Sequence, residues 1–173
     1  MAIELIYPNI DYENAWIDII SEFENASERI VPYALKCGMT DFQQYLKRTD
    51  EFSKGINLDG KVRADTYFLI DPSNPLRILG AINIRYDLNE YLLNYGGNIG
   101  YGIRPTERRK GYATAMLSLA LKICKNNGLK RVLITCDKVN IASAKTMISN
   151  GAIFENEVIH DGEIVQRYWI EIR

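Results

Sequence analysis

The feature that most constrains the fold is the stretch 98–136, where two apolar strands enclose a basic turn and a periodic helix. The first strand stops at Pro105, which cannot donate to a sheet. Apolar residues then recur at helical spacing over 111–127, and Gly128 provides a C-terminal stop. The next run, 132–136, is continuously apolar, which is typical of a strand covered on both faces. We therefore expect helices packed on a sheet, which is the α/β class.

The rest of the chain continues this alternation without a repeat, a low-complexity segment or a linker. Expected strands lie at 3–7, 67–70, 78–85, 98–103 and 132–136, helices at 11–26, after Thr40 and Asp41, at 111–127 and at 140–150, a polar surface loop at 49–62, an ambiguous segment at 87–95, and a closing hairpin at 153–159 and 164–172. This order predicts one mixed α/β domain over 1–173 with a central sheet.

The charge balance argues against large anionic partners. The chain has 21 basic and 22 acidic residues, so its formal net charge is -1. Such a chain has no overall field that would draw it to nucleic acid or to an anionic membrane, although a local basic cluster can still bind a small anion. The N-terminal sequence lacks the pattern of a signal peptide, and no run approaches membrane-spanning length. We expect a cytoplasmic protein without nucleic-acid or membrane partners.

The cysteine and histidine content gives little basis for a disulfide framework or a metal site. Cys37, Cys124 and Cys136 are odd in number and widely spaced, so they are expected to be small buried hydrophobes in a reducing compartment. His160 is the only histidine, lies beside an Asp-Gly turn and is expected to be exposed. No metal is expected.

The turn before the periodic helix has the composition of an anion-binding loop. A helix N-terminus presents unpaired N–H groups and a partial positive charge, so it attracts phosphate. Gly111 lets the backbone approach a diphosphate closely, Ala113 leaves the next turn clear, and Arg108, Arg109 and Lys110 add charge. Taken alone, the loop is also compatible with an ordinary solvated basic turn, which is the commoner situation.

Two other glycine patterns resemble phosphate-binding loops only superficially. Gly55 and the Gly60-Lys61 pair have the spacing of a P-loop, but Val62 replaces the required Ser or Thr and no apolar strand precedes the segment. The pattern that begins at Gly100 resembles a dinucleotide fingerprint, but Pro105 occupies the third glycine position.

In this context the segment around Gly111 resembles the GNAT superfamily of acyl-CoA-dependent N-acetyltransferases. The family signature is Arg or Gln, two residues, Gly, one residue, then Gly or Ala, and Arg108, Gly111 and Ala113 match it in register. The spacing from the preceding strand and Pro105 matches as well. The whole chain, including 96–101 and 167–170, resembles a subgroup of acetyltransferases inferred from sequence, which supplies no substrate.

A second block agrees with this resemblance. Asn140, Ser143 and the helix that ends at Gly151 are similar to the family's second cofactor-contacting segment, so the match spans about 98–152 in two separated parts. The resemblance implies a GNAT fold with a central, mixed and mostly antiparallel twisted sheet flanked by helices and a C-terminal β-hairpin. It implies acetyl-CoA as co-substrate, and a small-molecule or protein amine as acceptor. A homodimer is one assembly that it allows.

The resemblance also implies where the cofactor lies. The pantetheine arm would enter a gap between the strands 98–103 and 132–136, where backbone groups near 101–103 would polarise the thioester carbonyl. The cofactor-binding residues expected on this basis are Tyr101, Ile103, Arg108, Arg109, Lys110, Gly111, Tyr112, Ala113, Thr114, Asn140 and Ser143.

The proton-transfer groups are not assigned by the sequence. At a lysine-like pKa of about 10.4, roughly one amine in 2,500 is neutral at pH 7, a cost of about 4.6 kcal/mol, so a general base would help. Glu90 and Asp87 are the first carboxylates to test, and both are equally compatible with a solvated loop. Many relatives protonate the leaving thiol with a tyrosine where this chain has Met147. Cys136 or Tyr101 could substitute, but core packing explains both equally well.

Two alternative functions therefore stay open. The replacement at Met147 is compatible with a CoA-binding sensor or structural module that has lost turnover. The basic loop is also compatible with a nucleotide-binding protein.

Overall fold

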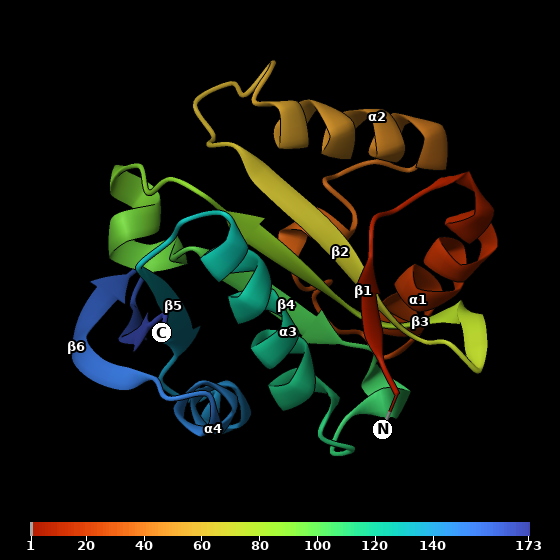
Figure 1. The fold of residues 1–173 in the computed structure, drawn as a ribbon. Helices are drawn as coiled ribbons and strands as arrows, with labels where there is room; N and C mark the ends of the chain where they lie inside the picture. Colours follow the sequence, from red (N-terminus) through yellow and green to blue (C-terminus); the bar gives the residue numbers. More distant parts are fainter. Residues whose placement is uncertain (1) are drawn as a thin grey trace.

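The computed structural model describes residues 2–173 (Figure 1). Its strands are β1 (Glu4–Ile6), β2 (Ala64–Asp71), β3 (Asn74–Arg85), β4 (Ile99–Ile103), β5 (Arg131–Asp137), β6 (Ile153–His160) and β7 (Glu163–Glu171). Its helices are α1 (Glu13–Asn25), α2 (Phe42–Lys54), α3 (Tyr112–Asn126) and α4 (Ile141–Ser149), and its short helical turns are η1 (Ile10–Tyr12), η2 (Tyr33–Leu35), η3 (Leu92–Gly96) and η4 (Pro105–Glu107).

The strands form two antiparallel sheets. The first has the order β1-β2-β3-β4 and the second the order β5-β7-β6. Helices flank both sheets, and the β6–β7 hairpin closes the chain (Figure 1). The expected α/β class, the largely antiparallel strand arrangement and the C-terminal hairpin are confirmed. The expected central sheet is divided in two between β4 and β5.

Alternate side chains of β3 face two separate hydrophobic cores. Ile82 and Ile84 belong to the core that contains residues of α3, whereas Ala81 belongs to the core that contains residues of α1 and α2. Because successive residues of a strand point to opposite faces, Asn83 and Arg85 lie on the same face as Ala81. Two polar side chains thus occur on a sheet face that is otherwise covered by the first two helices.

The expected polar loop at 49–62 is wrong in its first part, because α2 continues to Lys54. Asp41 caps the start of this helix as predicted, with its side chain accepting a backbone hydrogen bond. The helix ends at Gly55, whose φ of 71° is left-handed. A lysine–aspartate pair one turn apart, Lys54 with Asp50, supports the last turns. Polar composition here marks a solvent-facing helix.

The ambiguous segment 87–95 becomes a bend followed by a helical turn that ends in η3, a single turn of π-helix. It lies between β3 and β4 and covers one end of the gap between the two sheets. Within residues 2–173, no helix is both long and apolar enough to cross a membrane.

Candidate functional site

Asn98, the residue just before β4, bonds to β5, and the two strands separate after it. The Asn98 N–H donates to the Leu133 carbonyl at 2.7 Å, and Asn98 Oδ1 accepts from the Leu133 N–H at 2.8 Å. Toward β3, Asn98 Nδ2 donates to the Arg85 carbonyl at 3.0 Å, and the Asn98 carbonyl accepts from the Arg85 N–H at 2.7 Å. Asn98 is buried, and its backbone N–H and C=O and its side-chain Oδ1 and Nδ2 all form hydrogen bonds. It therefore joins the two sheets at the closed end of the gap.

Gly97 allows the strands to approach this closely. Its φ is 65°, and a Cβ at this position would lie 2.5 Å from the Leu133 carbonyl oxygen, closer than any side chain could sit. Next to this contact, the Thr135 hydroxyl donates to the Tyr95 carbonyl at 2.7 Å. The backbone before β4 is thus bonded to β5, and the gap opens only beyond it.

Beyond Asn98, no strand pairs with the edge of β4 that faces β5, although the Ile103 carbonyl at its end accepts a hydrogen bond from Arg108 Nε at 3.2 Å. β4 pairs with β3 alone, and the hydrogen bonds at Asn98 and Arg104 show that the even-numbered residues bond to β3. In an antiparallel ladder the alternate residues point their N–H and C=O groups the other way, so those of Tyr101 and Ile103 point into the gap. The structure therefore offers unpaired main-chain donors at the positions where the sequence predicted contact with the cofactor.

Side chains from β4 and α4 meet across the gap. The Tyr101 hydroxyl lies 2.9 Å from Ser143 Oγ, and Asn140 Oδ1 caps α4 by accepting from the Ser143 N–H at 3.1 Å. Burial raises the pKa of Tyr101 to about 12, so the phenol stays protonated at neutral pH. Tyr101, Asn140 and Ser143 all line the same cavity.

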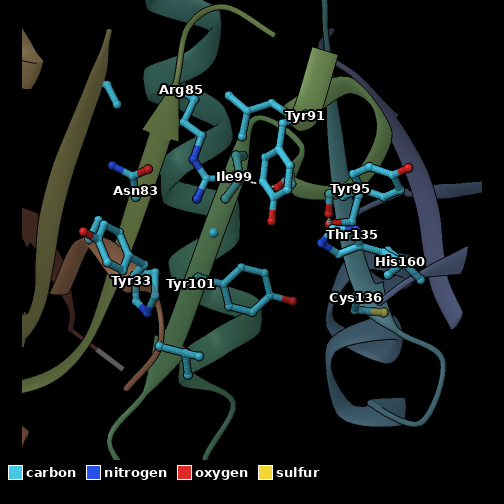
Figure 2. Close-up of a pocket in the computed structure, with 18 of the residues that line it drawn as sticks. Tyr33, Asn83, Arg85, Tyr91, Tyr95, Ile99, Tyr101, Thr135, Cys136 and His160 are labelled. Carbon is cyan, nitrogen blue, oxygen red and sulfur yellow. Dashed lines mark hydrogen bonds between the residues drawn. The ribbon is translucent and has the colours of Figure 1, made fainter. Parts of the chain in front are cut away.

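The gap leads into a cavity of about 790 Å³ (Figure 2). Figure 2 shows Arg85 and Tyr101 reaching in from the first sheet, with Tyr95, Cys136 and His160 on the opposite side. This volume is within the range of small-molecule sites. The cavity opens on the face of β3 that carries Asn83 and Arg85, and both residues line it.

The basic loop presents free backbone amides. Among the described residues, none of the N–H groups of residues 109–114 has a hydrogen-bond acceptor, and no side chain caps α3. Arg109 and Gly111 both have left-handed backbone, with φ of 61° and 83°. Alternation of left- and right-handed residues turns successive N–H groups toward one side and forms an anion-binding concavity. A Cβ on Gly111 would meet no atom within 4 Å, so the space in front of the loop is open.

The cationic side chains of the loop are only partly available. Arg108 forms a two-pronged pair with Glu28 at 2.9 and 2.6 Å, and this hydrogen bonding lowers the pKa of Glu28. Lys110 pairs with Glu107 at 2.8 Å. Arg109 forms no ion pair with any residue in 2–173. The free main-chain amides and Arg109, more than Arg108 or Lys110, are therefore the groups left to hold an anion here.

Helix α4 connects the loop to the cavity. Its first turn contributes Asn140 and Ser143 to the cavity wall. At its other end, Asn150 Nδ2 donates to the carbonyl of Thr114, in the first turn of α3, at 3.1 Å. Helix α4 thus bonds to the start of α3 at one end and lines the cavity at the other, and Tyr112 and Ala113 lie in the same first turn of α3.

The candidate proton-transfer residues are distributed differently from the sequence-based expectation. Asp87 and Glu90 are exposed, and neither lines the cavity. Met147 is fully buried in the core. Cys136 does line the cavity, but burial raises its pKa to about 11, so it is a neutral thiol. The prediction that His160 is exposed is wrong, because its ring is partly buried against other aromatic rings at the cavity.

His160 stacks on Tyr95 with ring centroids 4.2 Å apart, and Asp161 Oδ2 lies 3.5 Å from His160 Nε2. The β6–β7 hairpin and the turn before β4 bring these groups together from distant parts of the sequence. Within residues 2–173, no cluster of His, Cys, Asp or Glu is arranged to hold a metal ion.

Three site residues were missed by sequence reasoning. Asn98 was assigned only as the start of a strand, although the Gly-Gly-Asn run before that strand is a signal for a close backbone approach. His160 was set aside as a turn residue. Arg85 was assigned to the end of a strand, and an arginine that faces inward there could only be recognised once the face of β3 was known.

A family model described as an acetyltransferase (GNAT) domain matches residues 16–153. A search of curated proteins finds no match. The fold is similar to that of the microcin C7 self-immunity acetyltransferase MccE in complex with acetyl-CoA and AMP, with a TM-score of 0.68 and 19% identity over 99% of this chain and 93% of that one.

Two ribosomal-protein acetyltransferases are similar in the same way. RimL, a ribosomal L7/L12 α-N-protein acetyltransferase in complex with CoA, has a TM-score of 0.71 and 15% identity over 99% of this chain and 95% of that one. The ribosomal-protein-S5-alanine acetyltransferase from Vibrio fischeri has a TM-score of 0.69 and 16% identity over 98% and 92%.

The chain therefore belongs to the GNAT family of N-acetyltransferases, enzymes that use acetyl-CoA to acetylate amines. The sequence signature on which the family resemblance was based lies in this region: it includes Gly111 at the start of α3, and it follows β4 where β4 separates from β5.

Proposed function

We propose that this enzyme transfers an acetyl group from acetyl-CoA to a primary amine of a small molecule or a protein by direct attack in a ternary complex. The observation that carries the proposal is that the fold has both free amides at 109–114 and an edge of β4 that pairs with no strand, with α4 in contact with both regions. The similar structures include enzymes named for acetylation of ribosomal-protein termini, so a protein N-terminus is one acceptor to test.

The residues present fit a CoA molecule. The amides of residues 109–114 and the Arg109 side chain would hold the diphosphate, because unpaired N–H groups at a helix start favour an anion. The free N–H and C=O of Tyr101 and the free N–H of Ile103 would pair with the amides of the pantetheine arm, as a further strand would. Acetyl-CoA supplies the activated acetyl thioester. A β4 N–H group that points into the gap would polarise its carbonyl.

Tyr101 is suited to stabilising the leaving sulfur. Its pKa of about 12 lies well above the value of about 8.5 for a thiol, so complete proton transfer to the thiolate would be uphill by roughly 5 kcal/mol. A hydrogen bond from the phenol to the thiolate carries no such cost and is charge-assisted. We therefore assign Tyr101 the role of hydrogen-bond donor, which compensates for the methionine at position 147.

His160 is the best-placed group to accept a proton from the amine. An imidazole is the commonest general base in enzymes, and this one lines the cavity beside Asp161. The carboxylates Asp87 and Glu90 lie outside the cavity and would need a chain of water molecules. Replacement of His160 by Gln should lower kcat with little change in CoA affinity.

The second candidate is a CoA-binding module without turnover, which the buried Met147 favours. One experiment separates the two functions. CoA binding is measured by calorimetry, and thiol release from acetyl-CoA is followed with a panel of amines that includes peptides with free N-termini. Binding with amine-dependent thiol release supports the enzyme; binding without release from any amine supports the module. A preference for ATP over CoA at the same site would contradict both.

A further inference from the structure

Arg85 is held in the cavity by one edge of its guanidinium group. Its side chain projects from the end of β3 into the cavity (Figure 2). Nη1 donates to the carbonyls of Gly96 and Gly97 at 2.9 and 3.1 Å, which uses both of its hydrogens. The planar group is therefore fixed in orientation by the backbone that precedes β4.

The other edge of Arg85 has no partner. Nε and Nη2 form no hydrogen bond with any residue in 2–173, and no carboxylate pairs with this guanidinium. Most other buried or half-buried arginines pair with carboxylates, as Arg104 does with Asp18 and Arg167 with Glu155, whereas Arg63 stacks on the Tyr86 ring. Burial lowers the pKa of Arg85, because removal from water disfavours the charged guanidinium. The Nε–Nη2 edge is the one that binds a carboxylate or phosphate with two parallel hydrogen bonds.

Space for such a ligand is kept open by Gly100 on β4. A Cβ at Gly100 would lie 2.9 Å from Arg85 Nη2, so any other residue here would crowd the free edge. Gly100 is not in a left-handed conformation, and a side chain here would have to displace the guanidinium from its bonds to Gly96 and Gly97.

Charge is also divided between the two walls of the cavity. The cations that line it come from the first part of the chain, and the carboxylates come from the last part. The cations are Arg29, Lys61 and Arg85, and the carboxylates are Asp137, Asp161 and Glu163. An acceptor that carries an anion at one end and an amine at the other would match this arrangement, with its amine toward the side of His160.

We propose that the acceptor is an amine that also bears a carboxylate or a phosphate group, and that the free edge of Arg85 binds this oxyanion. The inference rests on the proposed function, and it makes Arg85 the residue that selects the acceptor. It also accounts for the charge separation of the cavity, which neither acetyl-CoA binding nor acetyl transfer requires.

Acceptor binding is tested on the CoA-saturated enzyme, where no acetyl group is present and affinity is measured without turnover. The probes are ω-amino carboxylates of about two to six carbons, the matched ω-amino amides, and ω-aminoalkyl phosphates of the same lengths. Calorimetry should find at least one anionic probe bound about tenfold or more tightly than its amide, as expected for a charge-assisted pair. The carboxylate and phosphate series show which oxyanion the site prefers.

The variants are Arg85→Gln, Arg85→Lys and the control Arg131→Gln, which removes an exposed arginine that stacks on Trp169 outside the cavity. Arg85→Gln should abolish the preference for anions. Arg85→Lys keeps the charge and can still donate to the Gly96 and Gly97 carbonyls but lacks the two-pronged edge, so it should retain only part of the preference. The control should behave as the parent enzyme does.

The inference is overturned if no anionic probe binds more tightly than its amide, or if the preference persists in Arg85→Gln. Either result would leave Arg85 as a clamp on the Gly96–Gly97 backbone only. CoA titrations of the same samples keep the two proposals apart. A parent enzyme that binds CoA and shows amine-dependent turnover but has no preference for anionic probes refutes this inference alone, whereas absence of CoA binding in the parent enzyme refutes the proposed function.

Discussion

Replacement of Asn98 by Ala should destabilise the protein strongly, because this one side chain joins the two sheets. The change removes the hydrogen bond from Nδ2 to the Arg85 carbonyl and the bond that Oδ1 accepts from the Leu133 N–H. Both backbone groups are then left without partners at a buried position. The perturbation is small in volume, so lost hydrogen bonding dominates its cost.

The expected magnitude follows from the two orphaned groups. A buried polar group deprived of its partner costs about 1–3 kcal/mol, so with two such groups the free energy of unfolding should fall by about 2–6 kcal/mol. This is a large part of the roughly 5–15 kcal/mol that stabilises a typical domain. The gap between β4 and β5 would also lose its fixed closed end, and CoA affinity should fall together with stability.

Equilibrium unfolding in urea, with and without CoA, measures both effects. The matched control is Asn127→Ala, which removes an exposed side-chain bond to the Ile123 carbonyl at 3.0 Å and should cost less than about 0.5 kcal/mol. A loss at Asn98 no larger than the loss at Asn127 would refute the reasoning, because it would show that the two sheets are held together without this residue.

Three further outcomes are expected. Gly111→Val should weaken CoA binding about tenfold or more with the fold intact. The control Gly128→Val changes another left-handed glycine with open space around it and should leave CoA binding unchanged. Calorimetry compares the two variants, and equal CoA affinities would show that the anion site lies elsewhere. Tyr101→Phe should lower kcat about 10- to 100-fold with nearly constant CoA affinity, and an unchanged kcat in steady-state assays would remove the proposed hydrogen bond to sulfur. Burial raises the pKa values of the three buried cysteines to about 11, whereas unfolded thiols ionise near about 8.5. The unfolded state therefore releases its protons first as the pH rises, and the free energy of unfolding should fall between these pH values by up to about 1.4 kcal/mol per pH unit for each thiol. Equal stability in urea titrations at about pH 8 and 10 would contradict this.

Much of the fold was predictable because local patterns determine it. The periodic helix that begins after Gly111, its stop at Gly128 and the strand that follows depend on residues close together in sequence. The boundary at Lys54 was missed because a polar helix face and a polar loop have similar compositions. Gly55 could have indicated the correct boundary, because helices commonly end at a glycine in the left-handed conformation.

The acceptor side of the site was not predictable from the sequence. Its character depends on which side chains lack partners, and a partner can come from any part of the chain. Arg85 is unpaired whereas Arg108 is paired with Glu28, yet both are arginines near a strand end or a turn. The placement of His160 required the register of the β6–β7 hairpin. Such contacts between distant segments become visible only in the folded structure.

The free edge of β4 has a consequence for how the protein behaves in a crowded solution. An unpaired strand edge on the outside of a protein is a template on which another chain can add, and it promotes aggregation. Here the edge is turned inward, because β5 and the first turn of α4 face it from the other side of the gap. The enzyme thus keeps a row of main-chain donors ready for an extended ligand and shields that row from neighbouring polypeptides.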